Sequence, residues 1–175
     1  VAVAELFRAD FSLFDPKVYD MYALILIDEE FGELIRDGKT LPYTKGSLVT
    51  IRPGQSIEVR LNYTTKPQGW ILAFKPELLE KTGLGRDFYM FSYFNLDYSE
   101  AINLTDMEYG VIKNCFANLY AELNTPKDHL SGQMIRLGIG TLLSYVKRYF
   151  EKQHTTNVRR GETLVCKLDT LLERY

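Results

Sequence analysis

The side chains that could act in acid–base or nucleophilic chemistry are few and far apart. The chain has two histidines, His129 and His154, which flank one predicted helix about 25 residues apart. A serine or cysteine nucleophile needs a base beside it, and neither histidine has such a neighbour in an evident motif. The sequence also has no nucleophile elbow, phosphate loop or dinucleotide fingerprint. We therefore expect that the chain is not an enzyme.

The only run of carboxylates is Asp28-Glu29-Glu30, with Glu33 nearby. Consecutive residues of a strand point to opposite faces, so three acids at a strand end indicate a solvated turn rather than a metal or acid–base site. The strand-rich part of the chain, up to residue 98, contains no histidine. A metal centre there would lack imidazole ligands, so we expect no metal and no cofactor.

Length and composition are those of one globular domain, or of one small domain with a helical annex. The chain has 175 residues, of which 46% are hydrophobic and 25% charged. Its formal net charge of −2 argues against direct nucleic-acid binding, which normally needs a basic face.

Several features bear on the compartment. The longest apolar run, Ala23 to Ile27, is far shorter than the roughly 20 residues of a membrane span. Val1 to Leu6 has neither the basic stretch nor the cleavage site of a signal peptide. Cys115 and Cys166 fit neither a disulfide framework nor a metal knuckle. We expect a cytoplasmic protein with no membrane contact.

Short apolar or alternating runs predict seven strands before residue 98, spaced as in a sandwich or barrel. Asp37-Gly38 is a strong signal for a two-residue hairpin, and Lys45-Gly46 and Pro53-Gly54 mark further turns. The expected strands are Phe11–Phe14, Tyr22–Asp28, Phe31–Arg36, Leu41–Tyr43, Leu48–Arg52, Ser56–Tyr63 and Gly69–Lys75.

From Ser99 onward the apolar period changes to that of helices. Thr105 and Glu108 form a capping box that starts the first helix, and Asn124-Thr125-Pro126 ends it. We expect a second helix over 128–152, a polar flexible linker over 154–161, and a third helix over 163–175.

The second helix carries two apolar stripes, one more than the sheets and the first helix can cover. We therefore expect a homodimer centred on this helix, with Gly138 or Gly140 allowing close helix approach. The alternative is that the helix over 163–175 covers the second stripe within the same chain. The expected interface consists of Ile135, Gly138, Ile139, Leu142, Leu143 and Val146.

The order of these features resembles the N-terminal domain of AraC-type transcriptional regulators. The matching segments are the glycine-turn strand pair Phe31 to Gly38, the strand Lys45 to Gln55 ending in Pro-Gly-Gln, Gly69 to Leu79, and Phe91-Ser92-Tyr93. Their order and spacing, with the trailing helices, cover essentially the whole chain. The resemblance implies a mainly β fold with α: a cupin-like barrel, or double-stranded β-helix, followed by two long helices and a linker helix.

The resemblance also implies a function and a division of the chain. Residues 1–98 would form the sensor barrel, 99–153 the helical dimerisation segment, and 154–175 the linker to a DNA-binding domain with helix-turn-helix motifs that this chain lacks. The family senses a small molecule, such as a sugar or another small metabolite, and touches DNA through that second domain. Family members often carry a histidine in the strand after the Pro-Gly turn, and residues 55–63 have none.

We expect an effector, if one binds, in the barrel mouth. Phe11, Tyr22 and Trp70 are the candidate stacking surfaces, and Arg36 or Arg60 the candidate anchor for an anionic group. Two other interpretations remain: a cupin-fold enzyme such as an isomerase or dioxygenase, and a dimerisation module that binds no ligand.

Overall fold

The computed structural model describes residues 1–5, 17–18, 21–62, 66–80, 83, 91–94 and 101–172. Side chains are described within these ranges except for residues 17–18, 92 and 156–172. The expected strand Phe11–Phe14, and with it the candidate ligand residue Phe11, lies outside the described residues.

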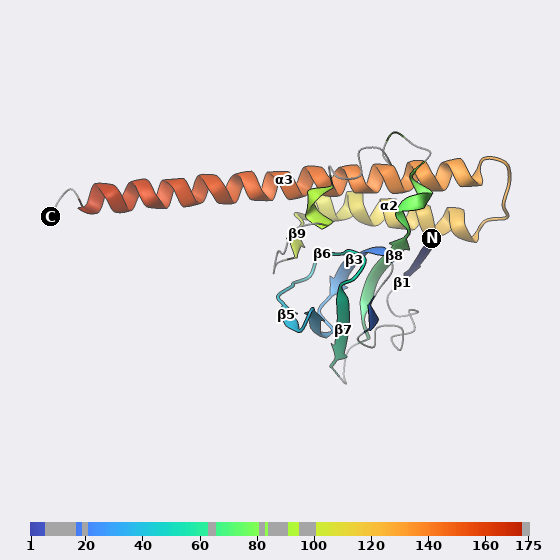
Figure 1. Cartoon of the computed structure of the whole chain (residues 1–175), viewed down its shortest axis with the longest axis horizontal. Helices are drawn as coiled ribbons and strands as arrows, with labels where there is room; N and C mark the ends of the chain where they lie inside the picture. The colour runs from blue at the N-terminus through green and yellow to red at the C-terminus, as the bar shows by residue number, and fades with distance from the viewer. Residues whose placement is uncertain are drawn as a thin grey trace.

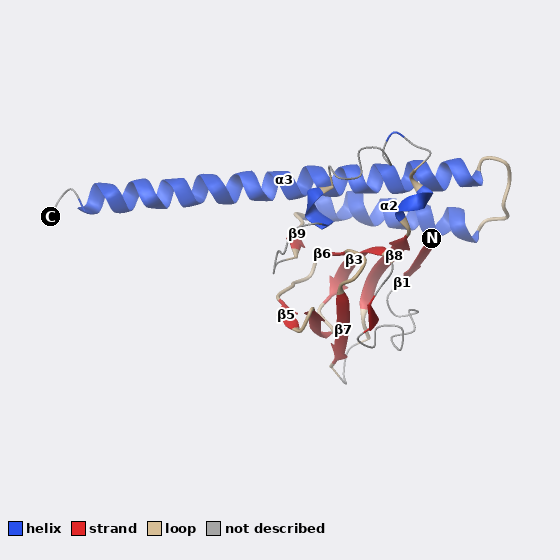
Figure 2. Cartoon of the chain, in the orientation of Figure 1, coloured by secondary structure: helices blue, strands red, loops and turns tan. Residues whose placement is uncertain are grey.

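The described strands form two antiparallel sheets (Figures 1 and 2). The five-stranded sheet has the order β1 (Ala2–Glu5), β8 (Gln68–Phe74), β3 (Tyr22–Glu29), β6 (Ser47–Ile51) and β9 (Ile102–Asn103). The four-stranded sheet has the order β2 (Lys17–Val18), β7 (Ser56–Leu61), β4 (Gly32–Arg36) and β5 (Lys39–Leu41). The sheets are open, so the closed barrel that the sequence predicted is not what the described strands form.

Most predicted strands within the described residues are confirmed, with ends shifted by one or two residues. The exception is the expected strand Leu41–Tyr43, because β5 begins earlier and ends at Leu41. The hairpin between β4 and β5 has the predicted two-residue loop, in which Asp37 and Gly38 have φ of 50° and 75°. These positive values are those of the turn that matches the twist of antiparallel strands. Strands β1, β2 and β9 were not predicted.

The central strand β3 is a continuous apolar run, so it has apolar side chains on both of its faces. Even-numbered positions face the helices and odd-numbered positions face the four-stranded sheet, so two separate cores result. The first core includes Leu24, Leu26, Leu48, Leu72 and Phe74; the second includes Ala23, Ile25, Ile27, Val49 and Ile51. The fold is therefore a three-layer stack of helices, five-stranded sheet and four-stranded sheet.

One close approach of the backbone explains a glycine in the second sheet. Gly32 has φ of 141°, and a Cβ atom there would lie 2.0 Å from the carbonyl oxygen of Arg60. The hydroxyl of Tyr43 accepts hydrogen bonds from the amides of Phe31 and Gly32 and donates to the Gly32 carbonyl at 2.7 Å. Only glycine fits this junction without moving β7.

Helix α2 (Asp106–Asn124) begins and ends where the sequence predicts. The Thr105 hydroxyl accepts from the Glu108 amide, and the Glu108 carboxylate accepts from the Thr105 amide, which confirms the capping box. At the other end Thr125 is extended, as expected for a residue before proline.

Helix α3 (Ser131–Leu172) is a single helix of 42 residues, so the expected linker over 154–161 is wrong as secondary structure. The segment is polar but contains no proline, and most of its residue types continue a helix at little cost. In Figure 1 the C-terminal part of α3 extends well beyond the sheets. The proposed division into domains is a separate question and stays a prediction.

Helices α2 and α3 pack closely where Gly138 meets Leu119. A Cβ atom at position 138 would lie 2.7 Å from Leu119 Cδ2, so the glycine does permit close helix packing, but with α2 of the same chain. The faces of α3 expected at a dimer interface are likewise turned inward: Ile139, Leu142, Leu143 and Val146 are each 0% exposed, and Ile135 packs against the same core.

The expected interface is therefore corrected. The apolar period on α3 shows how many faces are apolar, but not which of them contacts α2 and the sheet. The alternative, in which the helix over 163–175 folds back over this stripe, is also wrong, because α3 continues straight through those residues to Leu172.

Two glycine substitutions test the α2–α3 contact. Gly110 in α2 has no atom within 4 Å of a would-be Cβ, so Gly110→Ala is expected to stabilise the protein by up to about 1 kcal/mol through helix propensity. Gly138→Ala has the same propensity gain but forces Leu119 to move. We therefore expect its free energy of unfolding to be lower than that of Gly110→Ala by at least about 1 kcal/mol. Urea unfolding measures both, and equal stability of the two variants would contradict this packing.

Candidate functional site

A chain of hydrogen bonds crosses all three layers of the fold, from the four-stranded sheet to α3. Arg36 ends β4 on the same face as Leu34, which belongs to the core between the sheets. Its guanidinium Nη1 donates to the carbonyl oxygen of Thr50 in the five-stranded sheet at 3.0 Å. An arginine thus spans the space between the sheets at the end of β4.

The path continues on the helix side of the five-stranded sheet. The Thr50 hydroxyl donates to the Tyr93 carbonyl at 3.1 Å, and the Tyr93 hydroxyl donates to the Leu143 carbonyl of α3 at 3.0 Å. Both Thr50 and Tyr93 are buried. Burial raises the pKa of Tyr93 well above its ordinary value of 10.0, so the phenol stays neutral and remains a hydrogen-bond donor to the Leu143 carbonyl.

Of the four predicted ligand residues that the structure describes, only Arg36 is turned toward the space between the sheets. Trp70 packs against Phe116 and Tyr120 of α2, with ring centroids 6.4 and 5.5 Å away. Tyr22 stacks on Phe74 at 5.9 Å. Both aromatic residues therefore belong to the helix-facing core, and the stacking role predicted for them inside a barrel is corrected.

The other arginine predicted as an anchor lies elsewhere. Arg60 is on the four-stranded sheet with 61% of its side chain exposed, and it pairs with Glu58 at 2.7 Å and Glu33 at 3.6 Å. Strand alternation explains the difference: the β4–β7 register pairs Arg36 with the buried Ile57, but Arg60 with the exposed Glu33.

Tyr22 does lie near the end of the stack where Arg36 is found. Continuing the β3–β6 register one residue beyond its pair of Ala23 and Ile51 places Arg52, which follows the last residue of β6, opposite Tyr22. Partial burial raises the pKa of Tyr22, and the positive charge of Arg52 partly offsets that rise. The Tyr22 ring lies on the helix-facing side of the five-stranded sheet, whereas Arg36 lies on the side between the two sheets.

A second polar link joins the same sheet to α3. The Ser47 hydroxyl donates to Asn103 Oδ1 at 3.0 Å, and the backbone N–H of Asn103 donates to Gln153 Oε1 at 3.0 Å. Strand β6 is therefore linked to α3 at two points ten residues apart. Tyr93 makes the link to Leu143, and Asn103 makes the link to Gln153. Sequence analysis missed Thr50, Tyr93, Asn103 and Gln153, because their partners are distant in the chain and no local spacing marks them.

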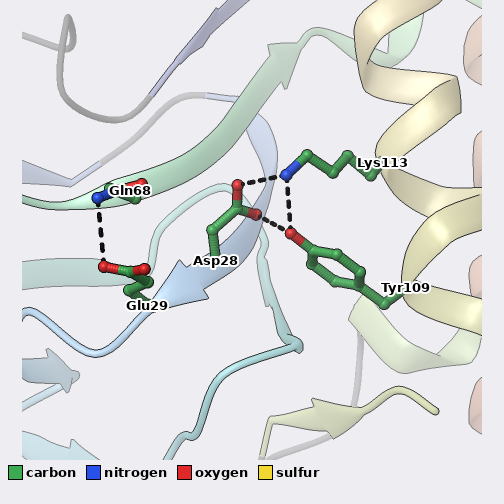
Figure 3. A network of polar contacts seen from close by, with 5 residues as sticks. All are labelled: Asp28, Glu29, Gln68, Tyr109 and Lys113. Carbon is green, nitrogen blue, oxygen red and sulfur yellow. Dashed lines mark hydrogen bonds and ion pairs between the residues drawn. The ribbon is translucent and has the colours of Figure 1, made fainter. Parts of the chain in front are cut away.

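A three-membered polar cluster fastens α2 to β3 (Figure 3). The Asp28 carboxylate accepts from the Tyr109 hydroxyl at 2.7 Å and from Lys113 Nζ at 2.8 Å, and Lys113 also donates to the Tyr109 oxygen at 2.9 Å. Asp28 is only 16% exposed, so the predicted solvated turn is wrong for this residue.

The prediction holds for the neighbouring acids, because Glu29 and Glu30 are exposed. In the same view Glu29 accepts a hydrogen bond from Gln68 at 3.2 Å. The signal for the cluster was the spacing of Tyr109 and Lys113 by four residues, which places both on one helix face.

Helix α2 is fastened to α3 by Glu108. Besides closing the capping box, its carboxylate accepts from Lys152 Nζ at 2.8 Å. Desolvation on its own would raise the pKa of Glu108, but the hydrogen bonds from Lys152 and Thr105 together lower it below its ordinary value of 4.5. Glu108 is therefore held ionised at the junction of the two helices.

Within the described residues no group of three or more His, Cys, Asp or Glu side chains is arranged to hold a metal ion. None of the helices in that part of the chain is both long and apolar enough to cross a membrane. No protein-family model and no curated protein matches this sequence. The candidate site is thus defined by its geometry: an inward arginine joined by buried hydrogen bonds to a long helix.

The lowered pKa of Glu108 predicts an acid-dependent loss of stability. A group whose pKa is lower in the folded state stabilises it above the unfolded pKa, near 4.5, and this contribution disappears as the pH falls further. Glu108→Gln is expected to cost about 1 kcal/mol at pH 7, the scale of a lost helix cap, and to weaken the dependence of stability on pH between about 5 and 3.

Urea unfolding at a series of pH values measures this effect. Asp106→Asn, at an exposed position of the same first turn of α2, is the matched control. A pH dependence in Glu108→Gln as steep as in the parent protein would contradict the role assigned to the Glu108 carboxylate.

Proposed function

We propose that this chain is the ligand-sensing and dimerisation domain of an AraC-type transcription regulator. It binds a small-molecule effector at the Arg36 end of the sheets and passes the bound state through the helices to a DNA-binding domain outside this chain. The protein acts in the cytoplasm, contacts DNA only through that second domain, and is not an enzyme.

The observation that carries the proposal is the hydrogen-bond path from Arg36 through Thr50 and Tyr93 to Leu143. A buried polar group costs free energy unless it is paired, so a path through two apolar cores is expected only where it specifies an arrangement or transmits one. Movement of the Arg36 guanidinium toward an effector would release the Thr50 carbonyl. That release would change the support of Tyr93 against α3.

The architecture is consistent with this family. Successive strands after β3 pass between the two sheets: β4 and β5 lie in one sheet, β6 in the other, β7 in the first again and β8 in the second. Antiparallel strands that alternate in this way are typical of double-sheet jelly rolls, the architecture to which cupins belong. Supporting the proposed output, α3 continues past the sheets as one helix (Figure 1).

The chemistry of the Arg36 end favours an effector with an anionic or oxygen-rich group. A guanidinium offers several donors in a fixed plane, which suits carboxylates, phosphates and neighbouring sugar hydroxyls. A sugar or another small metabolite therefore remains the expected class.

One observation favours a second candidate, a dimerisation module that binds no ligand. The described residues between the sheets, among them Phe31, Leu34 and Ile57, form a continuous apolar cluster. A filled layer of this kind would stabilise the sheets without an effector. The two candidates differ in whether any small molecule stabilises the protein through Arg36.

Thermal unfolding in the presence of monosaccharides, sugar phosphates and small carboxylates distinguishes them. A probe at about 100 times its dissociation constant adds about 2.7 kcal/mol of stability, which corresponds to an increase in Tm of roughly 5–10 °C for a chain of this size. Arg36→Gln is expected to abolish the increase. Arg60→Gln, on the outer face of the same sheet, is expected to retain it. An increase that survives Arg36→Gln, or no increase with any probe, contradicts effector binding at this site.

The proposed transmission makes a separate prediction for Tyr93. Tyr93→Phe removes only the hydroxyl that contacts the Leu143 carbonyl, at an expected cost of about 1 kcal/mol. Binding of an active probe is expected to remain, while its effect on amide hydrogen exchange in residues 139–150 of α3 is expected to disappear. The matched control is Tyr145→Phe, because Tyr145 is on α3 but outside the path. An unchanged exchange response in Tyr93→Phe would contradict the path.

A further inference from the structure

A groove of about 260 Å³ runs along the seam between α2 and α3, which lie side by side as an antiparallel pair (Figure 1). Its described lining is one stripe on each helix, with side chains spaced by three or four positions. Each stripe covers two helical turns, roughly 10 Å. The lining residues are Cys115, Asn118, Leu119 and Glu122 of α2, and Met134, Leu137, Gly138 and Thr141 of α3.

The floor of the groove is apolar and lies where the two helices approach most closely. Leu119 is 2% exposed and packs against Gly138. Met134 and Leu137 flank this contact and are 52% and 57% exposed. Concave surfaces with apolar walls and a few polar groups are typical of small-molecule sites. The volume lies just below the range for drug-sized ligands, so the groove suits a small ligand.

The rim of the groove carries a negative charge without a counter-charge. Among the described residues that line it, Glu122 is the only one with a formal charge at pH 7. The nearest lysine in the sequence, Lys127, donates instead to the carbonyl oxygens of Glu122 and Leu123, at 3.0 and 2.9 Å. No ion pair with the Glu122 carboxylate forms within the described part of the chain. Glu122 is also in the last turn of α2, where the helix dipole favours a cation.

The other polar groups of the groove are neutral and lie along its length. Burial raises the pKa of the Cys115 thiol, so this group stays protonated at pH 7. Asn118 and Thr141 are exposed and can donate or accept hydrogen bonds. The contact of Leu119 with Gly138 fixes the antiparallel register, which places Glu122 at one end of the groove and Cys115 at the other.

We propose that this groove binds a small organic cation, a primary amine about 10 Å long whose ammonium group pairs with Glu122 and whose apolar body lies on Leu137. The inference goes beyond the proposed function, because this second site has its described lining on the helices and not on the sheets. An anionic ligand would be repelled by the carboxylate. A purely apolar ligand would leave the carboxylate without a counter-charge.

The walls of the groove favour an aromatic body for this amine. The Met134 thioether is flexible and polarisable, and sulfur makes favourable contacts with aromatic rings. A ligand in this position would contact α2 through Glu122 and α3 through Met134 and Leu137. It would therefore add to the contact of Leu119 with Gly138 and stabilise the packing of the two helices.

Calorimetric titration with phenylbutylamine, phenylbutanol and phenylbutyrate tests the charge requirement. The three probes share one apolar body and are cationic, neutral and anionic at pH 7. We expect the amine to bind with a Kd at least about tenfold lower than that of the alcohol, the scale of one charge-assisted hydrogen bond. We expect no binding of the carboxylate probe. Equal affinity for the amine and the alcohol would contradict the pairing with Glu122.

Substitutions separate the charged part of the site from the apolar part. Glu122→Gln is expected to weaken amine binding by about tenfold and to leave alcohol binding unchanged. Asp106→Asn removes an exposed carboxylate elsewhere on α2 and is the matched control. Leu137→Ser is expected to weaken both probes by about tenfold, because part of the apolar wall is lost. Leu130→Ser, at a 45% exposed leucine outside the groove, is expected to leave both unchanged. Circular dichroism verifies that each variant remains folded.

Alkylation of Cys115 by iodoacetamide locates the bound amine. In a Cys166→Ser background Cys115 is the one cysteine of the chain. Phenylbutylamine at about ten times its Kd is expected to slow the alkylation by at least about fivefold, because most of the grooves are then occupied. Arg36→Gln is expected to retain this protection, because Arg36 is not part of the groove.

Three results would overturn the inference: no binding of the amine, binding that Glu122→Gln leaves unchanged, or binding without protection of Cys115. Protection of Cys115 that increases with protein concentration and not with the amine would assign the groove to a second copy of the chain, and would also overturn it. The thermal-unfolding test of Arg36 uses sugars and anions, so failure of the groove and failure of the proposed function are distinguishable.

Discussion

The five-stranded sheet has to be covered on both faces, and the rest of the structure depends on that requirement. Ala23 to Ile27 of its central strand are all buried, with alternate side chains in two different cores. A sheet that is apolar on both faces cannot leave either in water. The four-stranded sheet covers one face and the two helices cover the other, so each layer is stable only in the presence of the middle one.

Within such a stack, polar groups are informative because they are costly. Thr50 lies in the middle layer, where its carbonyl accepts from the four-stranded sheet and its hydroxyl donates toward the helices. A valine of similar shape would fill the same space without the hydroxyl. The polar residue at this position links the two cores by hydrogen bonds, and the proposed transmission from Arg36 to Tyr93 and α3 rests on that link.

The helical layer has two distinct kinds of surface. Its two helices are held together by the packing at Gly138 and by the pair of Glu108 and Lys152, and α2 is held on the sheet by the contacts of Asp28. Its outer face combines exposed apolar side chains with charges of opposite sign at the two ends.

Local rules determined the strands around their turns, the Asp37-Gly38 hairpin, the Thr105 capping box and the end of α2, because each depends on residues that are close in the chain. Alternation also determined that Trp70, Leu72 and Phe74 share one face. Only the tertiary structure decided that this face meets α2 instead of the space between the sheets, that Asp28 pairs with Lys113, and that α3 buries Ile139 but exposes Leu137. A period shows which side chains lie together, but the layer that covers them depends on how distant segments pack, and no local pattern specifies that.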